Sequence, residues 1–215
     1  MSLYTFSQND LMPSLNPLKG LRFEESTDIT LLSKMSGTSE EEIVKRLPND
    51  HIAFIAFLYE SPAAFGWMAR GKARIGELGH DLILPINNRY LWNFRTLPAF
   101  RGNNIYPLLL QFILSFENKK AEPFWIIHAP ENKPSLKGIL KAGFRYAGKL
   151  FLSSQGEATL EPYEISHEEI QVVKSMNFRL SEQAGPNCWG CNSPYIKNKP
   201  FSCCCTDAGE VCSTH

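Results

Sequence analysis

The chain has 215 residues, of which 43% are hydrophobic and 20% charged, a balance typical of a soluble globular domain. Basic and acidic residues number 22 each, so no overall charge favours binding to nucleic acid or to an anionic membrane. No apolar run approaches the length of a membrane span, and residues 1–16 lack the charged-then-apolar pattern of a signal peptide. We therefore expect a cytoplasmic protein.

Expected strands alternate with short helices along most of the chain, as in an α/β (α+β) protein. Strands are expected at 20–25, 51–59, 64–69 and 90–96, and a short helix at 29–35. The stretch 51–59 is nearly all apolar and rich in Ile and Phe, which is typical of a strand buried on both faces. Ser39 followed by Glu42 forms a capping box, so a second helix is expected to begin there. A glycine-punctuated stretch at 71–88 precedes the strand at 90–96.

The turn after residue 96 carries the most information. It contains Arg, Gly and Asn and opens an amphipathic helix, with Pro107 expected at the first helical position, where its missing N–H costs no helix bond. Gly and Asn tolerate left-handed conformations that aim several N–H groups at one anion, next to the positive end of the helix dipole. The turn therefore predicts a phosphate cradle. An ordinary strand-to-helix turn, with glycine present for steric reasons, is the alternative.

A second segment follows about thirty residues later. Residues 124–128 indicate a short buried strand, and 131–144 indicate a helix closed by Gly143. Together the two segments resemble the GNAT superfamily of N-acetyltransferases, over residues 21–153. The residues that match its two signatures, in the family's order, are Pro98, Phe100, Arg101, Gly102 and Ile105, then Asn132, Ser135, Gly143 and Phe144.

This resemblance implies a mixed central sheet flanked by helices and an enzyme that transfers an acyl group, most simply from acetyl-CoA, directly to a small-molecule or amino-acid-like amine. The loop after Arg101 would hold the CoA pyrophosphate through backbone N–H groups, and Thr96 and Leu97 would lie along the pantetheine arm. Asn132 would hydrogen-bond that arm or the backbone beside it. The implied cofactor-binding residues are Thr96, Leu97, Arg101, Gly102, Asn103, Asn104, Ile105, Tyr106, Asn132 and Ser135.

Three positions depart from the family pattern. Asn104 and Tyr106 stand where glycine or a small residue is usual, although Asn tolerates positive φ. Ile139 stands where many members carry a general-acid tyrosine. Tyr146 or a water is then expected to protonate the departing thiolate. The alternative is a non-catalytic CoA-binding or scaffold protein. Its C-terminal tail at 188–215, which holds all the cysteines, would then contact a partner.

Candidate bases for deprotonating the amine lie in two places. Glu77, His80 and Asp81 precede the strand at 90–96, where the resemblance places substrate-facing residues, and His128 ends the later strand. A solvent-exposed loop position is the alternative for His80, and a core histidine bonded to a carbonyl is the alternative for His128.

Three basic residues, Arg70, Lys72 and Arg74, alternate along the chain. They would suit an acceptor that carries a carboxylate, or they form a solvated face. The expected partners are acyl-CoA and a small amine, with a homodimer as a candidate assembly and neither nucleic acid nor membrane.

All six cysteines lie in the tail, and Ser166 with Glu169 predicts a capped helix before it. Cys-x-x-Cys and a later cysteine group suit one tetrahedral Zn site, which would stabilise a tail too short for its own core. An iron–sulfur cluster and paired or redox-active thiols are the alternatives. The candidate ligands are Cys188, Cys191, Cys203, Cys204, Cys205 and Cys212. The expected division is an acetyltransferase domain at 1–160, a connecting helix and linker at 161–187, and a metal-binding tail at 188–215.

Overall fold

A nine-stranded mixed sheet carries the fold in the computed structural model, which describes residues 1–117, 122–130 and 132–183. Across the sheet the strands are β11 (Arg179–Leu180), β10 (Ala158–Pro162), β9 (Arg145–Leu152), β1 (Ser2–Phe6), β8 (Phe124–His128), β7 (Arg89–Thr96), β4 (Ser61–Ala69), β3 (His51–Leu58) and β2 (Leu21–Ser26). The expected mixed α/β fold, with a central sheet flanked by helices, is confirmed. No helix in these three ranges is long and apolar enough to cross a bilayer.

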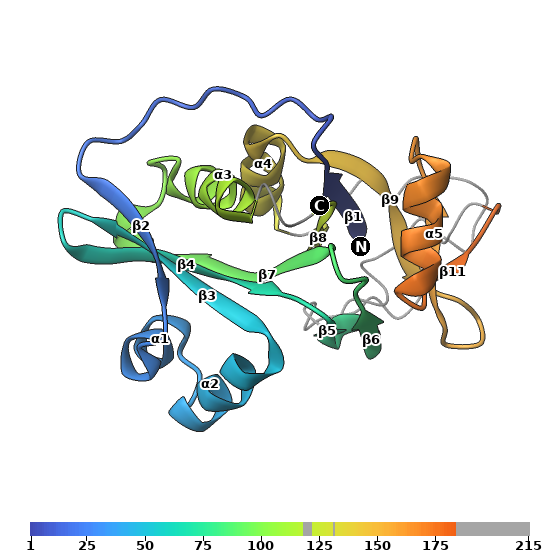
Figure 1. Cartoon of the computed structure of the whole chain (residues 1–215), viewed down its shortest axis with the longest axis horizontal. Helices are drawn as coiled ribbons and strands as arrows, with labels where there is room; N and C mark the ends of the chain where they lie inside the picture. Colours follow the sequence, from blue (N-terminus) through green and yellow to red (C-terminus); the bar gives the residue numbers. More distant parts are fainter. Residues whose placement is uncertain (118–121, 131, 184–215) are drawn as a thin grey trace, which may run out of the picture.

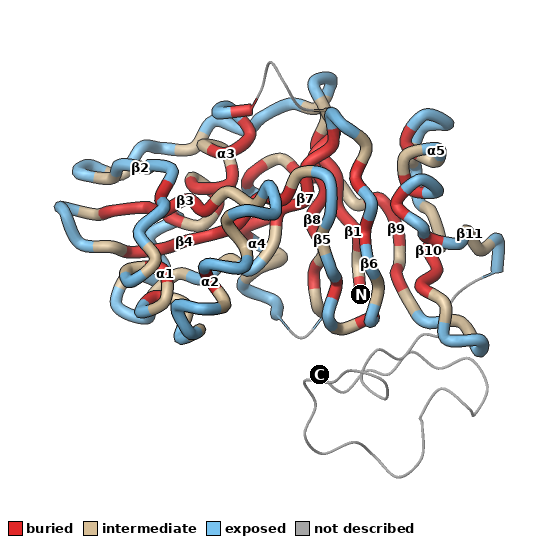
Figure 2. Tube along the Cα trace, turned by 60° about the horizontal axis from the view of Figure 1, so that its bottom comes forward, coloured by how far each residue is buried: buried red, intermediate tan, exposed pale blue. Residues whose placement is uncertain are grey.

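Helices cover both faces of this sheet (Figure 1). One face carries α3 (Ile105–Glu117) and α4 (Lys133–Ala142), and the other carries α1 (Ile29–Ser36), α2 (Glu40–Arg46), α5 (His167–Ser175) and the hairpin of β5 (Lys72–Ile75) and β6 (His80–Ile83). Strand β3 shows why its sequence is apolar throughout. Phe54 packs with α3, while Ile55 packs with α1 and α2, so successive residues face two different cores. Figure 2 shows the buried stretches running along the central strands.

Local sequence signals set the helix ends. Ser39 accepts a hydrogen bond from the N–H of Glu42, Ser166 completes its capping box with Glu169, and Gly143 ends α4 at φ 104°. The expected position of Pro107 is wrong by two residues, because α3 begins at Ile105. Pro107 is instead the third residue of the helix, where its missing N–H still has no partner to lose.

Strand β1 was not expected from the sequence. It lies in the middle of the sheet, antiparallel to both β8 and β9. At the far edge, β11 pairs with β10, and Val173 of α5 packs in the same cluster as Leu3 and Leu160. The expected connecting segment at 161–187 thus contains a helix that packs on the sheet and an edge strand of the sheet itself, and the expected tail at 188–215 lies outside the described residues.

Candidate active site

Parallel strands β7 and β8 separate after a short paired stretch. They pair only from Arg89–Phe124 to Leu91–Ile126, although both strands continue further. On its other side β7 bulges where it faces β4, and Asn93 in the bulge adopts φ 52°. Two neighbouring cavities lie around this divergence.

The outer cavity, of about 580 Å³, lies between the first turns of α3 and α4. Gly102 at φ 85° and Asn104 at φ 54° turn the chain into α3, as expected of a turn that exposes its amides. Within the described residues, the N–H groups of Gly102, Asn104, Ile105 and Tyr106 make no hydrogen bond of normal geometry. Four free donors therefore lie at the positive end of a 13-residue helix, which is the arrangement that binds phosphate.

Positive side chains surround these amides. Arg101, Lys137 and Lys141 line the outer cavity, and none of its described lining residues is acidic. Arg95 lines it as well, but its Nη1 donates to the carbonyl of Ser36 in α1, on the other face of the sheet. The Lys141 Nζ donates to Asn104 Oδ1 at 2.8 Å, and the Arg101 Nε donates to the Thr96 carbonyl at 3.2 Å. The outer cavity is thus suited to a multiply charged anion.

The inner cavity, of about 950 Å³, lies where β7 and β8 separate. Its walls come from both strands, the first turn of α4, the α1–α2 region and the β5–β6 hairpin. Phe94, Tyr106, Asn132 and Ser135 line both cavities, so they form the boundary between them. A ligand bound in the outer cavity can extend toward the inner one only past these four residues.

Tyr106 is the largest side chain of that boundary. Its hydroxyl lies 3.4 Å from Ser135 Oγ, and its ring packs against Phe94 with centroids 5.4 Å apart. A Cβ at Gly138 would lie 2.2 Å from the Tyr106 ring, so only glycine fits beneath it. Burial raises the pKa of Tyr106, and the phenol therefore stays protonated near neutral pH.

Most of the expected cofactor residues line the outer cavity. These are Thr96, Arg101, Gly102, Asn104, Ile105, Tyr106, Asn132 and Ser135. Leu97 instead packs against the cluster under α1 and α2, and the Asn103 amide donates to the carbonyls of Phe100 and Arg101. Asn132 caps α4, with its Oδ1 accepting from the Ser135 N–H at 3.2 Å.

The expected catalytic residues divide into two groups. His128 and Glu77 line the inner cavity, and His128 Nε2 donates to the Asn132 carbonyl at 2.9 Å. His80 lines neither of the two cavities, because its ring stacks on Phe178 and its Nε2 donates to the Met176 carbonyl at 2.9 Å. Tyr146 also lies away from both, between the rings of Tyr4 and Tyr163.

Ile139 is fully buried in the core under α3 and α4. A side chain there faces the helix interface. The position therefore offers no group to either cavity in this chain.

The cavity-lining residues that the sequence did not indicate include two lysines of α4 and the pair Arg46 and Trp92. Lys137 and Lys141 stand four apart on α4, and that spacing would have placed both on one helix face. Arg46 and Trp92 come from distant segments and meet only in the folded chain. The six cysteines lie outside the described residues. Among the described residues, no group of three or more His, Cys, Asp or Glu side chains could hold a metal ion.

Comparisons with known proteins return solved structures but no sequence match. No family model matches the chain, and no curated protein does. The solved structures with a similar fold include acetyltransferases described as GCN5-related or as members of the GNAT family, the family that the two sequence signatures resemble.

A GCN5-related N-acetyltransferase from Kribbella flavida is 13% identical, with a TM-score of 0.45, over 67% of this chain and 53% of that one. The chain thus spans about half of that protein's length. The aminoglycoside N-acetyltransferase AAC(6')-Iy in complex with CoA is 18% identical, with a TM-score of 0.48, over 62% and 96%. A predicted acetyltransferase with acetyl-CoA from Clostridium acetobutylicum is 16% identical, with a TM-score of 0.42, over 58% and 90%.

Proposed function

We propose that this chain is an acyl-CoA-dependent N-acyltransferase that transfers an acetyl group from acetyl-CoA directly to a small amine. The observation that carries the proposal is the cradle of four free N–H groups at the start of α3, near the cationic side chains of Arg101, Lys137 and Lys141. A CoA pyrophosphate supplies the anionic oxygens that such a cradle binds. The strand divergence beside it would admit the pantetheine arm into the inner cavity.

The reaction needs few groups beyond this positioning. The amine nitrogen attacks the thioester carbon, the C–N bond forms, the C–S bond breaks, and one proton passes from nitrogen to the departing thiolate. His128 and Glu77 are the proposed proton acceptors, because both line the inner cavity. The His128 Nε2 donates to the Asn132 carbonyl at 2.9 Å, which holds the orientation of the ring at the wall of the inner cavity.

A non-catalytic CoA-binding or scaffold protein is the second candidate. It is favoured by the Tyr106 ring, which stands between the two cavities, and by the buried Ile139, which offers no acid. Turnover separates the two candidates, because both require CoA to bind.

The test combines binding with turnover on the full chain. Acetyl-CoA at about a hundred times its dissociation constant should stabilise the fold by roughly 2.7 kcal/mol in thermal unfolding. Arg101→Glu should abolish the shift by placing a carboxylate beside the phosphates, whereas Lys19→Glu, an exposed charge reversal outside the cavity, should keep it. A missing shift at millimolar acetyl-CoA rejects both candidates. Binding without CoA release from any of a panel of amines selects the scaffold.

We also propose that the tail holds one structural Zn bound by Cys188, Cys191 and two of the later cysteines. Thiolate-rich sites select Zn or iron–sulfur clusters over hard cations. Elemental analysis should give about one Zn per chain, as in a closed four-thiolate site, or iron if a cluster is present. Replacing Cys188 and Cys191 together with Ser should release the metal. Metal-free protein with paired cysteines on thiol counting would contradict the proposal.

A further inference from the structure

Arg46, the last residue of α2, lies over two tryptophan rings of the sheet. Its guanidinium carbon is 4.9 Å from the Trp92 ring centroid and 5.5 Å from that of Trp67, and its side chain is only 15% exposed. Arg46 lines the inner cavity. It also lines a side cavity of about 900 Å³ between α2 and the β5–β6 hairpin. Arg46 is thus a largely buried cation at the wall of the inner cavity, the cavity that the proposed proton acceptors also line.

Four N–H donors on Arg46 and the two tryptophans make no hydrogen bond within the described residues. They are the Nε and Nη1 of Arg46 and the indole nitrogens of Trp67 and Trp92, and all four are buried. Glu42 is a neighbour on the same helix, at 3.5 Å from Nε, an ion-pair contact and not a hydrogen bond. Buried N–H groups are nearly always paired, so the two unpaired guanidinium nitrogens of Arg46, a residue that lines the inner cavity, point to an acceptor that a ligand brings there. Trp67 is not among the residues that line that cavity, so its indole nitrogen is no part of the proposed site.

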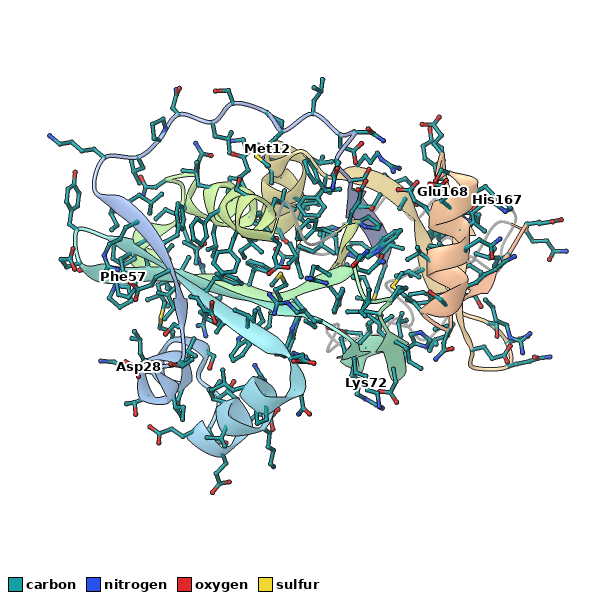
Figure 3. All side chains as sticks on the ribbon, in the orientation of Figure 1. Met12, Asp28, Phe57, Lys72, His167 and Glu168 are labelled. Atoms are coloured by element: carbon teal, nitrogen blue, oxygen red, sulfur yellow. The ribbon has the colours of Figure 1, made fainter. Side chains whose placement is uncertain are left out.

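The other basic side chains nearby are already engaged. Arg70 binds the buried carboxylate of Glu117, and Arg74 binds Asp81 at 2.7 Å. Lys72, which is labelled in Figure 3, is exposed, and it lines the side cavity but not the inner one. The three residues that the sequence suggested for a carboxylate are therefore less suitable than Arg46, which lines the inner cavity and whose ion pair with Glu42, at 3.5 Å, includes no hydrogen bond.

We infer that the amine acceptor carries a carboxylate, and that Arg46 binds this carboxylate where Arg46 and Trp92 line the inner cavity. This inference rests on the proposed function. The carboxylate would bind at the Arg46 end of the cavity, which leaves the amine free to extend toward the β7–β8 divergence, where the thioester would lie. Amino acids have this combination of groups, and neutral amines lack it.

The experiment measures carboxylate binding apart from turnover. The probes are the N-acetylated forms of the common amino acids, each paired with its carboxamide, which is nearly the same size but has no charge. Thermal unfolding of the full chain is followed with CoA present. At least one acetylated amino acid should raise the unfolding temperature further while its carboxamide does not. Arg46→Gln should raise the apparent dissociation constant of the carboxylate roughly 30-fold or more, as expected for a charge pair that loses one partner.

Lys45→Gln is the matched control, because Lys45 neighbours Arg46 but lines only the side cavity. It should leave carboxylate binding unchanged, and Arg46→Lys should restore part of the loss. Retention of the CoA-induced shift in Arg46→Gln shows that this variant is folded. If CoA stabilises the wild type but carboxylates and carboxamides behave alike, the inference is overturned and the proposed function stands. If CoA itself has no effect, the proposed function fails first.

Discussion

At the scale of single residues, Tyr106 and Gly138 depend on each other. The aromatic ring from α3 fills the space above the one α4 residue that has no side chain, and Phe94 packs against the same ring. A large residue at the start of α3 is thus accommodated by a small one on α4. The pair determines how wide the passage between the two cavities is.

Gly138→Ala should therefore destabilise the protein, although alanine favours a helix over glycine by about 1 kcal/mol. The new methyl group would lie 2.2 Å from the Tyr106 ring, and overpacking of this kind costs about 1–3 kcal/mol. Urea unfolding should show this loss, and adding Tyr106→Ala should remove the penalty that the methyl group causes. Gly76→Ala is the control, since no atom lies within 4 Å of that position. Equal penalties for Gly138→Ala with and without Tyr106 would contradict the packing argument.

His51 makes stability depend on pH. Burial lowers the pKa of its imidazole, and this outweighs the hydrogen bond to the Lys72 carbonyl, which raises it. The unfolded chain has a histidine pKa of about 6.5, so below that pH the unfolded state binds more protons than the folded one. The free energy of unfolding should then fall as the pH drops below about 6.5.

Urea unfolding at about pH 7.5 and pH 5.5 measures this dependence. His51→Gln should reduce the difference between the two conditions, and His167→Gln, an exposed position on α5, should not. An unchanged difference in His51→Gln would assign the acid sensitivity to other groups.

At the scale of elements, β1 is the least expected part of the fold. It pairs with β8 over residues 2–6 on one side and with β9 over residues 2–5 on the other, so it is an inner strand of the sheet. Thr5 is completely buried there, opposite Trp125 and Arg145.

Thr5→Pro should destabilise the protein by at least about 3 kcal/mol, because proline removes a ladder hydrogen bond and leaves a carbonyl unpaired. Urea unfolding gives the value. Ser154→Pro is the control, since Ser154 occupies the second position of the turn closed by the Gly156 N–H and the Ser153 carbonyl, where proline is favoured. Tolerance of proline at Thr5 would mean that β1 is not an integral strand.

Elements with local signals were predictable, and β1 was not. Ser39, Ser166 and Gly143 mark helix ends through contacts within four residues, which the sequence displays directly. Residues 2–6 form a short strand whose partners lie far along the chain, and no turn marks it. The hairpin β5–β6 was hidden for a related reason, because its two strands have only four residues each.

The candidate site divides in the same way. The outer cradle is one continuous turn, so Gly102 and Asn104 could be identified from their backbone freedom alone. Arg46 and Trp92 belong to α2 and β7, and only the tertiary fold brings the guanidinium onto the ring. His80 illustrates the opposite case, a plausible base that the fold turns toward Phe178.

At the scale of the whole molecule, basic and acidic residues are equal in number but unevenly distributed. The chain has 22 basic and 22 acidic residues, yet the described lining of the outer cavity includes four basic residues and no acidic one. The attraction for an anionic ligand is therefore local and decays over a Debye length of about 10 Å at 0.1 M salt.

Acetyl-CoA affinity should accordingly weaken as salt rises. Replacing Lys137 and Lys141 together with Met should raise the dissociation constant about tenfold, the factor that 1.4 kcal/mol of lost attraction produces, and should flatten the salt dependence. Titration calorimetry at two salt concentrations measures both effects. Lys174→Met, on the exposed side of α5, serves as the control. A salt-independent affinity would show that these cations do not contact the phosphates.

The central position of β1 has a consequence for how the chain folds. Tyr4 pairs with Ile126, about 120 residues later, so these contacts close one of the longest loops in the molecule. During synthesis, β2, β3, β4 and β7 can pair with sequence neighbours, while β1 waits for β8 and β9 to leave the ribosome. Among the described strands, β1 alone joins β8 to β9, so the two halves of the sheet become one body when that strand is inserted between them.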